Sequence, residues 1–437
     1  MTDVRTIAYE ALLDVENGRT LSNTKEVLDK YSYLERNDRG FLKRLIEGVI
    51  ERRITIDYVL DLYSRVPVSK MKKQIRTLLR MGTYQLLYTD VSDHAAVNET
   101  VRLARMKGFD RLSGFVNGVL RTIIRNRDSI PWPDENADVV RYMSVRYSCP
   151  EWIVNKLVNE QGRDNAETLL ELSVSIRPVT ARVNLSRSDV TDAAARSGGR
   201  ISDICGCAIV LDDIDNIRDI PAFADGSICI QDISSMLVGM VAGVKENDTV
   251  LDVCASPGGK SLHAADLAAG GIVTALDVSE RKIARIRENI DRCGFSNIET
   301  AVADATVYNE RYEEYADIVI ADVPCSGLGV MGRKNDSKYN ISEESIDELV
   351  KLQRKILDNA ARYVKRGGIL MFSTCTCSLP ENQGNMSYLT EKCRLTPVDF
   401  YDLLPDRLKD TTARDGYIQL YGKDKLTDGF FIGKLVK

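Results

Sequence analysis

Short apolar strands alternate with helical stretches from Gln231 onward, and this pattern constrains the fold more than any other feature of the sequence. Strands of this kind form a parallel sheet that helices cover on both faces. The last apolar run before the C-terminus predicts a hairpin strand. We therefore expect a doubly wound α/β domain over residues 231–437. The expected strands are Thr249–Val253, Val273–Asp277, Thr300–Ala303, Ala316–Asp322, Gly368–Ser373 and Gly429–Val436.

The first 130 residues show a helical period instead. Their apolar residues recur at i, i+3, i+4 and i+7, the spacing that gathers them on one face of a helix. Pro131-Trp132-Pro133 follows this region and predicts a linker, because two prolines break any helix. The pattern predicts an all-α domain over 1–130. The spacing is seen in Val4, Ile7, Ala8, Ala11, Leu12 and Val15, and again in Leu42, Leu45, Ile46, Val49 and Ile50.

Between these regions the sequence predicts a small α/β module over residues 145–230. Ser148-Cys149-Pro150-Glu151 has the pattern of a capping box, which predicts one helix running to about Glu171. A second helix is expected over Ser186–Ser197. A chain of 437 residues is too long for one core, and three domains fit its length. The strands expected in the module are Val179–Asn184, Ala208–Leu211 and Ser227–Gln231.

The composition is that of a soluble globular protein, with 44% hydrophobic and 28% charged residues and a mean hydropathy of -0.20. No apolar run approaches the ~18 residues that a membrane span requires. The N-terminal residues lack the apolar segment of a secretory signal. We expect a cytoplasmic protein with no membrane partner.

Ten cysteines and two histidines limit the possible chemistry. Cysteines in a cytoplasmic protein remain reduced thiols, and no C-x-x-C pair suggests a metal site. With only His94 and His263 available, histidine metal sites and a Ser-His-Asp triad are disfavoured. We expect no metal, and we expect acid–base or nucleophilic chemistry to use Cys, Asp, Glu or Lys.

The net charge of -5 conceals a basic N-terminal region. Residues 1–127 contain 23 Lys and Arg against 16 Asp and Glu, and the segment Arg65–Arg127 contains 13 against 4. A local excess of this kind can follow a nucleic-acid backbone even on an acidic protein. The alternative interpretation is a solvated helical surface without a partner.

A glycine-containing loop follows the first strand of the C-terminal domain. Ligands of open α/β sheets bind beyond the carboxyl ends of the strands. The adjacent glycines let the backbone approach a ligand, and the helix that follows offers free N–H groups. We expect this loop to line a cofactor pocket through Cys254, Ala255, Ser256, Pro257, Gly258, Gly259 and Lys260.

Acidic residues at the next strand ends indicate which cofactor binds. Asp277 ends the second strand, 25 residues after Asp252, where a carboxylate accepts the hydroxyls of a ribose. Asp304 ends the third strand, where it could accept a hydrogen bond from an adenine amino group. A glycine turn without a ligand does not explain acids at three successive strand ends. The pattern indicates an adenosine-containing cofactor.

Three cofactors of this kind are candidates for the loop. The loop lacks the G-x-G-x-x-G of dinucleotide sites. Gly259-Lys260-Ser261 fits the end of a phosphate-binding P-loop, but Cys254 stands where that motif needs its first glycine. S-adenosylmethionine carries no phosphate and requires only backbone room. The sequence favours S-adenosylmethionine.

The fourth and fifth strands lead into cysteines. One strand runs into Asp322-Val323-Pro324-Cys325 and the other into Thr374-Cys375-Thr376-Cys377, so Asp322, Cys325 and Cys375 should meet in one cleft. A thiolate that adds to carbon 6 of cytosine makes carbon 5 nucleophilic enough to attack a sulfonium methyl group. Asp322 near N3 would stabilise the ring charge, and a helix N-terminus or Lys260 could lower the thiol pKa.

Other readings of these residues stay open. Cysteine is a common buried residue, so Cys254 and Cys377 are expected to be packing residues, and Cys325 alone could be one too. Two thiols beside an acid favour chemistry. An amino-group methylase would need Asn or Asp followed by two prolines and an aromatic residue, and the sequence after Asp322 has neither the second proline nor the aromatic.

These segments resemble the RNA cytosine-5 methyltransferase (NOL/NOP/Sun) family. The resemblance lies in Cys254–Lys260, Asp322–Gly327, Ser373-Thr374-Cys375 and Pro380-Glu381-Asn382, and Gln231–Ser235 is similar to the segment ahead of the catalytic sheet. The helical N-terminus, with Phe115–Arg121, resembles the NusB-type RNA-binding domain, and Tyr147–Trp152 resembles the segment that follows it. Ser256 and Val323 stand where the family usually has alanine.

The resemblance implies a fold and a set of roles. It implies a NusB-like domain, an RRM-like linker domain and a Rossmann-like methyltransferase domain. Cys375 would be the nucleophile that attacks carbon 6, and Cys325 would assist release of the enzyme–RNA adduct. The cofactor pocket would be lined by the Cys254–Lys260 loop, Asp277, Asp304 and Asp322.

The resemblance also implies the partner, which is small-subunit ribosomal RNA. Because the target base must leave its stack, a loop or an rRNA not yet fully assembled is favoured over finished duplex. Transfer RNA or another rRNA site is the first alternative. A catalytically idle RNA-binding or antitermination factor, suggested by the basic helical N-terminus, is the second.

Overall fold

The computed structural model describes residues 3–18, 27, 29–31, 33–212, 214, 216–333 and 336–437. The chain forms two compact units. The first contains Met1–Ser175 and Met331–Asn340, and the second contains Ile176–Val330 and Ile341–Lys437. This division differs from the expected domains 1–130, 145–230 and 231–437, because the helices before Ser175 belong to the first unit and the small sheet belongs to the second.

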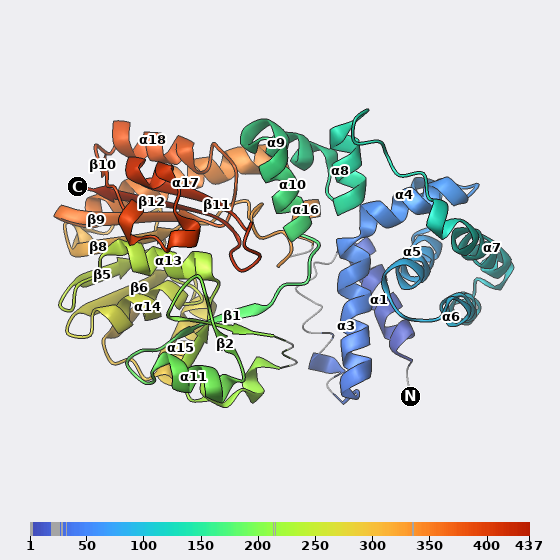
Figure 1. Ribbon diagram of the computed structural model, residues 1–437, viewed down its shortest axis with the longest axis horizontal. Helices are drawn as coiled ribbons and strands as arrows, with labels where there is room; N and C mark the ends of the chain where they lie inside the picture. Colours follow the sequence, from blue (N-terminus) through green and yellow to red (C-terminus); the bar gives the residue numbers. More distant parts are fainter. Residues whose placement is uncertain are drawn as a thin grey trace. The chain divides into compact units, whose positions relative to one another are not determined.

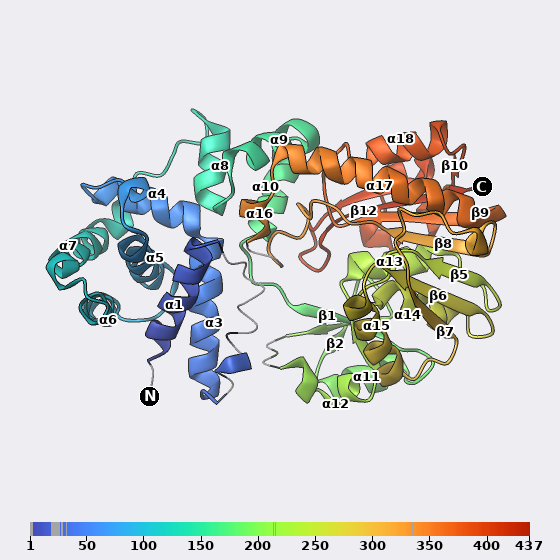
Figure 2. The same ribbon diagram turned by 180° about the vertical axis from the view of Figure 1, so that it is seen from behind.

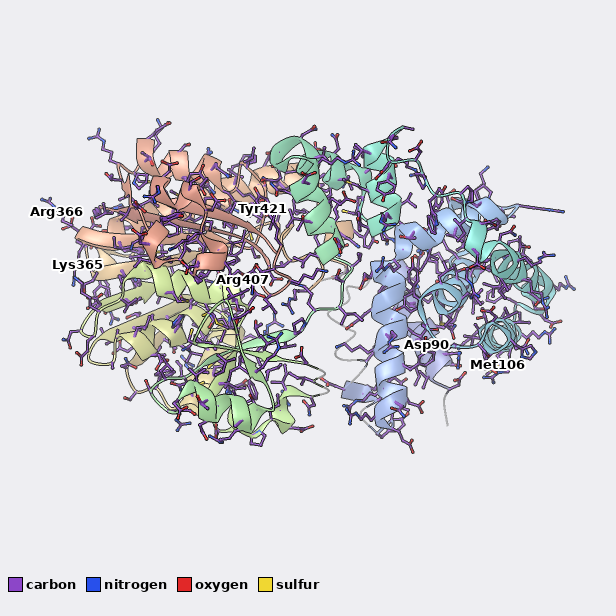
Figure 3. All side chains as sticks on the ribbon, viewed as in Figure 1. Asp90, Met106, Lys365, Arg366, Arg407 and Tyr421 are labelled. Carbon is purple, nitrogen blue, oxygen red and sulfur yellow. The ribbon has the colours of Figure 1, made fainter. Side chains whose placement is uncertain are left out.

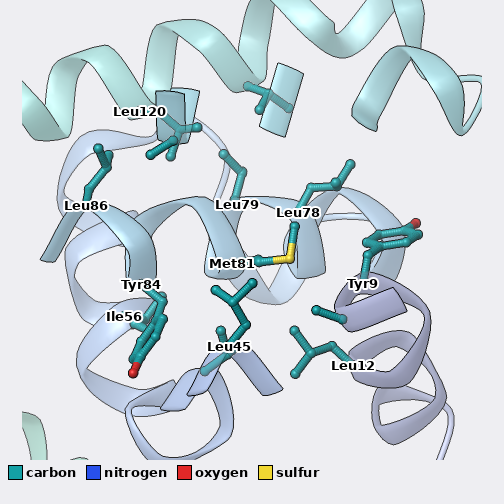
Figure 4. Close-up of a cluster of buried hydrophobic side chains, with 14 of the residues drawn as sticks. Tyr9, Leu12, Leu45, Ile56, Leu78, Leu79, Met81, Tyr84, Leu86 and Leu120 are labelled. Carbon is teal, nitrogen blue, oxygen red and sulfur yellow. The ribbon is translucent and has the colours of Figure 1, made fainter. Parts of the chain in front are cut away.

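The first unit is helical in its described residues, as its apolar period predicted. Leu78, Leu79 and Met81 of α5 belong to one apolar cluster with Leu12 and Leu45, and all five side chains are at most 4% exposed. Figure 4 shows Leu79 pointing toward Leu120 and Met81 lying beside Leu45. A helix that buries apolar residues on several sides is the centre of a bundle. The helices are α1 Val4–Glu16, α3 Arg36–Glu51, α4 Arg53–Tyr63, α5 Lys73–Tyr88, α6 Asp93–Met106, α7 Asp110–Asn126, α8 Val139–Tyr147, α9 Glu151–Gln161 and α10 Arg163–Leu172.

The prediction of a single capped helix from 151 to about 171 was wrong. Gly162, at φ +78°, separates α9 from α10. Pro150 precedes α9 and makes no side-chain cap bond. Ser148 has a left-handed backbone, and its Oγ instead accepts a hydrogen bond of 2.9 Å from the Ile54 N–H in the first turn of α4. The serine therefore caps a different helix, which the local sequence does not reveal.

A short segment from the C-terminal half completes the first unit. Residues 331–340 include α16 Ser337–Asn340, and Lys338 of this helix is 1% exposed. Its Nζ donates to the Glu51 carbonyl at 3.0 Å, and the Arg53 guanidinium lies 3.7 Å from the centroid of the Tyr339 ring. Burial lowers the pKa of Lys338 to about 8. The sequence did not predict this insertion into the helical unit.

The second unit begins with a small antiparallel sheet in the order β2-β3-β1-β4. The predicted strand Ala208–Leu211 is present with the predicted ends, and the other two predicted strands and the predicted helix are present with one or both ends shifted. β2 was not predicted, because two exposed residues show no alternation. The elements are β1 Val179–Val183, α11 Val190–Ser197, β2 Arg200–Ile201, β3 Ala208–Leu211 and β4 Ile228–Ile230.

The large sheet has the order β10-β12-β9-β8-β5-β6-β7, and β11 pairs with β12 (Figure 1). The five strands from β9 to β7 are parallel, whereas β10, β11 and β12 are antiparallel to their neighbours. The sheet is therefore mixed, although the final hairpin is present. The strands are β5 Thr249–Asp252, β6 Ile272–Asp277, β7 Ile298–Val302, β8 Ala316–Asp322, β9 Val364–Thr374, β10 Thr396–Pro397, β11 Tyr417–Tyr421 and β12 Gly429–Val436.

Helices cover both faces of this sheet, as predicted (Figures 1 and 2). Val250 and Met371 pack in one apolar cluster with α13, while their neighbours Leu251 and Leu370 pack in another with α17. Because successive strand residues face opposite layers, strands buried on both sides are apolar throughout. The main helices are α13 Ile233–Ala242, α14 Gly259–Leu267, α15 Glu280–Cys293, α17 Glu343–Tyr363 and α18 Gln383–Glu391.

The order of the parallel strands fixes the place of a ligand site. The chain proceeds from β5 outward to β6 and β7, and then returns to β8 on the other side of β5. Crevices at such a switch point, beyond the carboxyl ends of the strands, bind ligands. Lys365 and Arg366, labelled in Figure 3, lie near the start of β9 and so mark its other end. Within the described ranges, no helix has the length and apolar character to cross a membrane.

Candidate active site

The loop after β5 is folded tightly against β6. The Ala255 N–H donates to the Leu276 carbonyl at 2.9 Å. Gly258, at φ +104°, would bring a Cβ within 3.3 Å of Ile286, so a side chain here is both strained and crowded. α14 begins immediately afterwards at Gly259. The loop's own N–H groups at residues 254, 255, 256 and 258 are bonded within the fold, so the switch point receives the start of α14 from this segment.

Asp277 lies directly against this loop at the end of β6. It is 4% exposed, and its Oδ2 accepts a hydrogen bond of 3.0 Å from the Ser256 N–H. Its Oδ1 accepts from the Val278 N–H at 2.7 Å and lies 3.0 Å from Lys282 Nζ. The acid predicted to bind a ribose is thus held in one orientation at the edge of the loop.

Asp304 lies just beyond β7, which ends at Val302, and it is exposed. Its Oδ1 accepts hydrogen bonds from the Thr306 hydroxyl at 2.7 Å and the Thr306 N–H at 2.9 Å. These bonds lower the pKa of Asp304 below its usual value. An ionised, outward-facing carboxylate at the third strand end has the chemistry to accept from an amino group.

Asp252 has a structural role that the sequence did not indicate. It is 1% exposed, and its Oδ2 accepts a hydrogen bond of 2.6 Å from the Ser261 hydroxyl of α14. Its Oδ1 accepts from the Cys254 N–H at 3.3 Å. Burial raises the pKa of Asp252 to about 7, because the charged form loses its hydration. Asp252 ties the beginning of the loop to the helix behind it.

An ion pair connects the loop to the next strand. Lys260 Nζ donates to Asp322 Oδ2 at 2.6 Å, and the Ser373 hydroxyl donates to Asp322 Oδ1 at 2.8 Å. The Lys260 side chain is 9% exposed and its ammonium lies 5.3 Å from the centroid of the Phe430 ring. Asp322 therefore joins the ends of β8 and β9 to the start of α14.

The two predicted cysteines meet just beyond this ion pair. Cys325 Sγ and Cys375 Sγ are 3.3 Å apart, and both side chains are half-buried. The hydrogen bond to Cys375 raises the pKa of the Cys325 thiol well above its ordinary value, and burial and the Glu381 and Asp322 carboxylates add to the shift. The Cys325 thiol therefore stays protonated, and one hydrogen bond can form between the two sulfurs.

Glu381 holds the two cysteine loops together. It is fully buried; its Oε1 accepts from the Ser326 N–H at 2.8 Å and from Gln353 Nε2 at 3.0 Å. Its Oε2 accepts from the Ser326 hydroxyl at 2.5 Å, and that hydroxyl lies 2.6 Å from the Thr376 hydroxyl. Because Ser326 follows Cys325 and Thr376 follows Cys375, one carboxylate fixes both. In the sequence this residue was recognised only as part of the Pro380-Glu381-Asn382 motif.

Asn382 shapes the turn that carries Cys375. Its Oδ1 accepts from the Thr374 hydroxyl at 2.6 Å, and its Nδ2 donates to the Thr376 carbonyl at 2.9 Å. Cys377 on the same turn is fully buried and accepts from Gln419 Nε2 at 3.2 Å. Burial raises the pKa of Cys377, so this thiol stays protonated. Its surroundings are those of a packing residue.

The donor groups around the loop suit a ribose and an amino acid rather than a metal. In the parts of the chain that the structure describes, no group of three His, Cys, Asp or Glu side chains is arranged to hold a metal ion. A switch-point sheet with a glycine-containing loop and an acid at the next strand end suits an adenosine-containing cofactor, and without the dinucleotide and P-loop motifs it fits the class of S-adenosylmethionine-dependent methyltransferases. The first glycine of a P-loop is absent, so the nucleotide-triphosphatase interpretation is not supported.

Comparison with known proteins identifies the family. The family model for 16S rRNA methyltransferase RsmB/F matches residues 240–436, and the NusB family model matches residues 2–125. The probable ribosomal RNA small subunit methyltransferase B of Bacillus subtilis (strain 168) is 36% identical over 100% of this chain and 99% of its own length. Its counterpart in Escherichia coli O1:K1 / APEC is 28% identical, again over 100% and 99%.

Solved structures share the fold. The structure of PH0851 superimposes with a TM-score of 0.79 at 22% identity, covering 100% of this chain and 99% of that one. NSun6 from Pyrococcus horikoshii with SFG superimposes with a TM-score of 0.57 at 20% identity, covering 66% and 98%. The chain belongs to the RsmB/F family of 16S rRNA methyltransferases and carries an N-terminal NusB-type domain. It is an S-adenosylmethionine-dependent methyltransferase.

Proposed function

We propose that this protein methylates carbon 5 of a cytosine in 16S ribosomal RNA through a covalent adduct between Cys375 and carbon 6. The observation that carries the proposal is the thiol pair, with Cys325 Sγ and Cys375 Sγ 3.3 Å apart. Cys325 and Cys375 come just after the ends of β8 and β9, and these ends are joined by a hydrogen bond of 2.8 Å from the Ser373 hydroxyl to Asp322. A methyl donor and a nucleophilic thiol at one sheet edge suit a base whose carbon must first be activated.

The reaction begins with the Cys375 thiolate, whose sulfur adds to carbon 6 and breaks the 5,6 double bond. The electron pair moves to carbon 5, which then bonds the methyl group supplied by the bound cofactor. A base removes the carbon-5 proton, the double bond re-forms, and the carbon–sulfur bond breaks to return the thiolate. The Cys325 S–H stabilises the thiolate before attack, and Cys325 assists release afterwards.

Asp322 and the loop complete the proposed site. Asp322, held by Lys260 at 2.6 Å and by Ser373 at 2.8 Å, accepts a hydrogen bond from a protonated N3, so the ring is positively charged and takes up the electron pair when the sulfur adds. Asp277 binds the cofactor ribose and Asp304 its adenine amino group. The remaining contacts to the cofactor come from residues 254–260. Each of these roles fits the donor and acceptor groups described above.

The proposed RNA partner is small-subunit rRNA before the subunit is fully assembled, because the cytosine must be turned out of its stack to reach the thiol. The names of the relatives in Bacillus subtilis and Escherichia coli support the rRNA target. Under this proposal the base is the family's usual one, cytosine 967, and the protein works in the cytoplasm. Methylation of transfer RNA or of a second rRNA site is the alternative.

Bisulfite sequencing tests the product. RNA is taken from cells that have the protein, cells that lack it, and cells that carry Cys375→Ala. The proposal expects one cytosine of 16S rRNA to be protected from bisulfite in cells that have the protein. This protection should be lost in cells that lack the protein and in cells that carry Cys375→Ala. Protection confined to transfer RNA would move the target to the alternative. If no cytosine differs among the three strains, the cytosine-5 reaction is wrong and a catalytically idle RNA-binding factor becomes the better account.

A further inference from the structure

Cys205 and Cys207 form another pair of thiols in contact, outside the site described above. Their Sγ atoms are 3.2 Å apart, and Gly206 alone separates them in the turn between β2 and β3. The Cys205 N–H donates to the Ser202 hydroxyl at 3.4 Å, and the Cys205 carbonyl accepts from the Ala208 N–H at 2.9 Å. These bonds hold the turn that brings the two sulfurs together.

The two cysteines differ in their access to solvent. Cys205 is 1% exposed and its Sγ lies 3.4 Å from Met240 Sδ of α13, whereas Cys207 is half-buried. Gly206 is exposed, and a Cβ there would meet nothing within 4 Å, so the outer side of the turn is open. A small solute can therefore reach Cys207 but not Cys205.

The charges around the pair make Cys207 the reactive thiol. The hydrogen bond from Cys205 and the nearby charge of Arg182 lower the pKa of Cys207 to about 7, although burial acts in the opposite direction. Arg182 is itself 1% exposed and donates to Asp266 Oδ2 at 2.9 Å. The contact with Cys207 raises the pKa of Cys205, which keeps its proton. The thiolate is the form that attacks a peroxide, so Cys207 reacts first.

The spacing of the two sulfurs suits a disulfide better than a metal ion. Two thiolates bound to one tetrahedral zinc ion, each at about 2.3 Å, lie about 3.8 Å apart. The Sγ atoms of Cys205 and Cys207 are already closer, at 3.2 Å. Among the residues that the structure describes, His, Cys, Asp and Glu form no group of three that could hold a metal. A disulfide needs only a further approach to about 2.05 Å.

We propose that Cys205 and Cys207 are a reversible thiol–disulfide site that reacts with hydrogen peroxide. The Cys207 sulfur attacks one peroxide oxygen, the oxygen–oxygen bond breaks, and the hydroxide that leaves takes up the proton that Cys207 had released. The Cys205 sulfur then attacks the sulfur of the Cys207 sulfenic acid. The sulfur–oxygen bond breaks, and water leaves with the Cys205 proton. Two thiols are oxidised to one disulfide, and the peroxide is reduced to two waters.

The sequence spacing makes this disulfide easy to reduce again. A bond between residues two apart closes a small ring, and strained disulfides are the labile ones. In a reducing compartment, the disulfides that do form are transient and serve catalysis or redox sensing. The bond also removes the thiolate charge beside Arg182. The inference does not depend on the proposed function, because neither thiol takes part in the methyl transfer described above.

The test treats the reduced full-length protein with hydrogen peroxide, blocks the remaining thiols with N-ethylmaleimide and digests the protein with trypsin. The tryptic peptide 201–218 contains Cys205 and Cys207 and no other cysteine. Mass spectrometry should find this peptide unalkylated and two hydrogens lighter, and dithiothreitol should restore both alkylation sites. A peptide that stays alkylated at both cysteines would overturn the proposal, and so would irreversible oxidation of Cys207 without a disulfide.

Cys229 and Cys293 provide a matched internal control. Their Sγ atoms are 3.3 Å apart, and the hydrogen bond from Cys293 lowers the pKa of Cys229 to about 6. The two residues are only 3% and 1% exposed. Because this pair has the proximity and the lowered pKa but not the access, a cross-link between its peptides should form about tenfold more slowly. Equal rates for the two pairs would overturn the assignment of a specific site.

Three variants assign the roles of the sulfurs. Cys205→Ser should leave a Cys207 sulfenic acid that dimedone labels, and Cys207→Ser should slow oxidation of the buried Cys205 by about tenfold. Met240→Leu keeps the packing but removes the third sulfur, so it should form the disulfide at the wild-type rate. Oxidation of Cys205 at the wild-type rate in Cys207→Ser would overturn the order of attack. Wild-type thiols that react only after a chelator is added, with that protection lost in Met240→Leu, would show a metal site instead.

Discussion

The sulfur of Cys325 lies 3.3 Å from the sulfur of Cys375, and one buried carboxylate, that of Glu381, fixes the residues that follow both. The two cysteines are 50 residues apart in sequence and lie on loops after neighbouring parallel strands. Their contact is therefore a consequence of the strand order. A thiol pair at this edge of the sheet is suited to form and then release a covalent bond to a base.

Replacing Cys325 by alanine should stall the enzyme on ordinary RNA. Without this thiol the Cys375 adduct forms but is released slowly, so a protein–RNA complex that survives denaturing electrophoresis should accumulate. Cys393→Ala, which alters a cysteine of the second unit outside the cysteine pair, is the control and should leave no such complex. If Cys325→Ala instead methylates RNA at the wild-type rate without accumulating a complex, release of the enzyme–RNA adduct does not depend on this residue.

Replacing Glu381 by glutamine should lower kcat while leaving cofactor affinity unchanged. The amide would place an N–H against the Ser326 and Thr376 hydroxyls, and a mismatched buried hydrogen bond costs about 1–3 kcal/mol. Steady-state kinetics and calorimetry with S-adenosylmethionine separate the two effects. Glu391→Gln, on the exposed end of α18, should match the wild type in both. Loss of cofactor affinity in Glu381→Gln would contradict the role proposed for Glu381, which is to hold the two cysteine loops together.

S-adenosylmethionine should stabilise the protein through Asp277. A ligand at a hundred times its Kd adds about 2.7 kcal/mol to the free energy of unfolding, which raises the Tm. Asp277→Asn should lose most of that rise, because a neutral amide is a weaker acceptor for ribose hydroxyls. Glu280→Gln, on the exposed start of α15, should keep it. A Tm raised by ATP and not by S-adenosylmethionine would contradict the cofactor assignment.

The buried Asp252 predicts a pH dependence of stability. Its pKa is raised to about 7, whereas in the unfolded chain it is near the usual value for aspartate. The unfolded state therefore releases the proton first, and Asp252 reduces the free energy of unfolding progressively as the pH rises from about 4 to about 7. Above that range the loss is complete and constant.

Urea denaturation at pH 5 and pH 8 measures this effect. Compared with the wild type, Asp252→Asn should lose less stability between the two pH values, because its side chain does not ionise. Asp291→Asn, on the exposed side of α15, is the control and should follow the wild type. A parallel loss in wild type and Asp252→Asn would mean that Asp252 is ionised throughout the range.

The sequence predicted the parallel strands well, because each is a short apolar run that ends in a chemically distinct residue. Among them Ala316–Asp322 was predicted to the residue, as were the antiparallel strands Ala208–Leu211 and Gly429–Val436. β2 and β10 were not predicted, since two residues carry no periodic signal. The break at Gly162 was missed as well, because an isolated glycine in a helical pattern is often tolerated.

The sequence predicted which strand ends carry the site residues. It did not predict the hydrogen bonds and ion pairs that connect these residues. Motifs placed Cys325, Cys375 and Asp322 at one edge of the sheet. The pairing of Asp322 with Lys260 and Ser373 depends on side-chain directions that the motifs do not contain. The hydrogen bonds from Ser326 to Glu381 and from Lys338 to Glu51 join residues far apart in sequence. Local patterns could therefore not reveal them.

The central claim is that Cys375 forms the bond to carbon 6, and trapping that bond tests it most directly. An RNA transcript containing 5-fluorocytosine cannot release the enzyme after methyl transfer, because fluorine replaces the proton that must leave carbon 5. Mass spectrometry of the digested complex should find the nucleotide attached to Cys375, and Cys375→Ala should form no complex. An adduct attached to Cys325, or one undiminished in Cys375→Ala, would contradict the account.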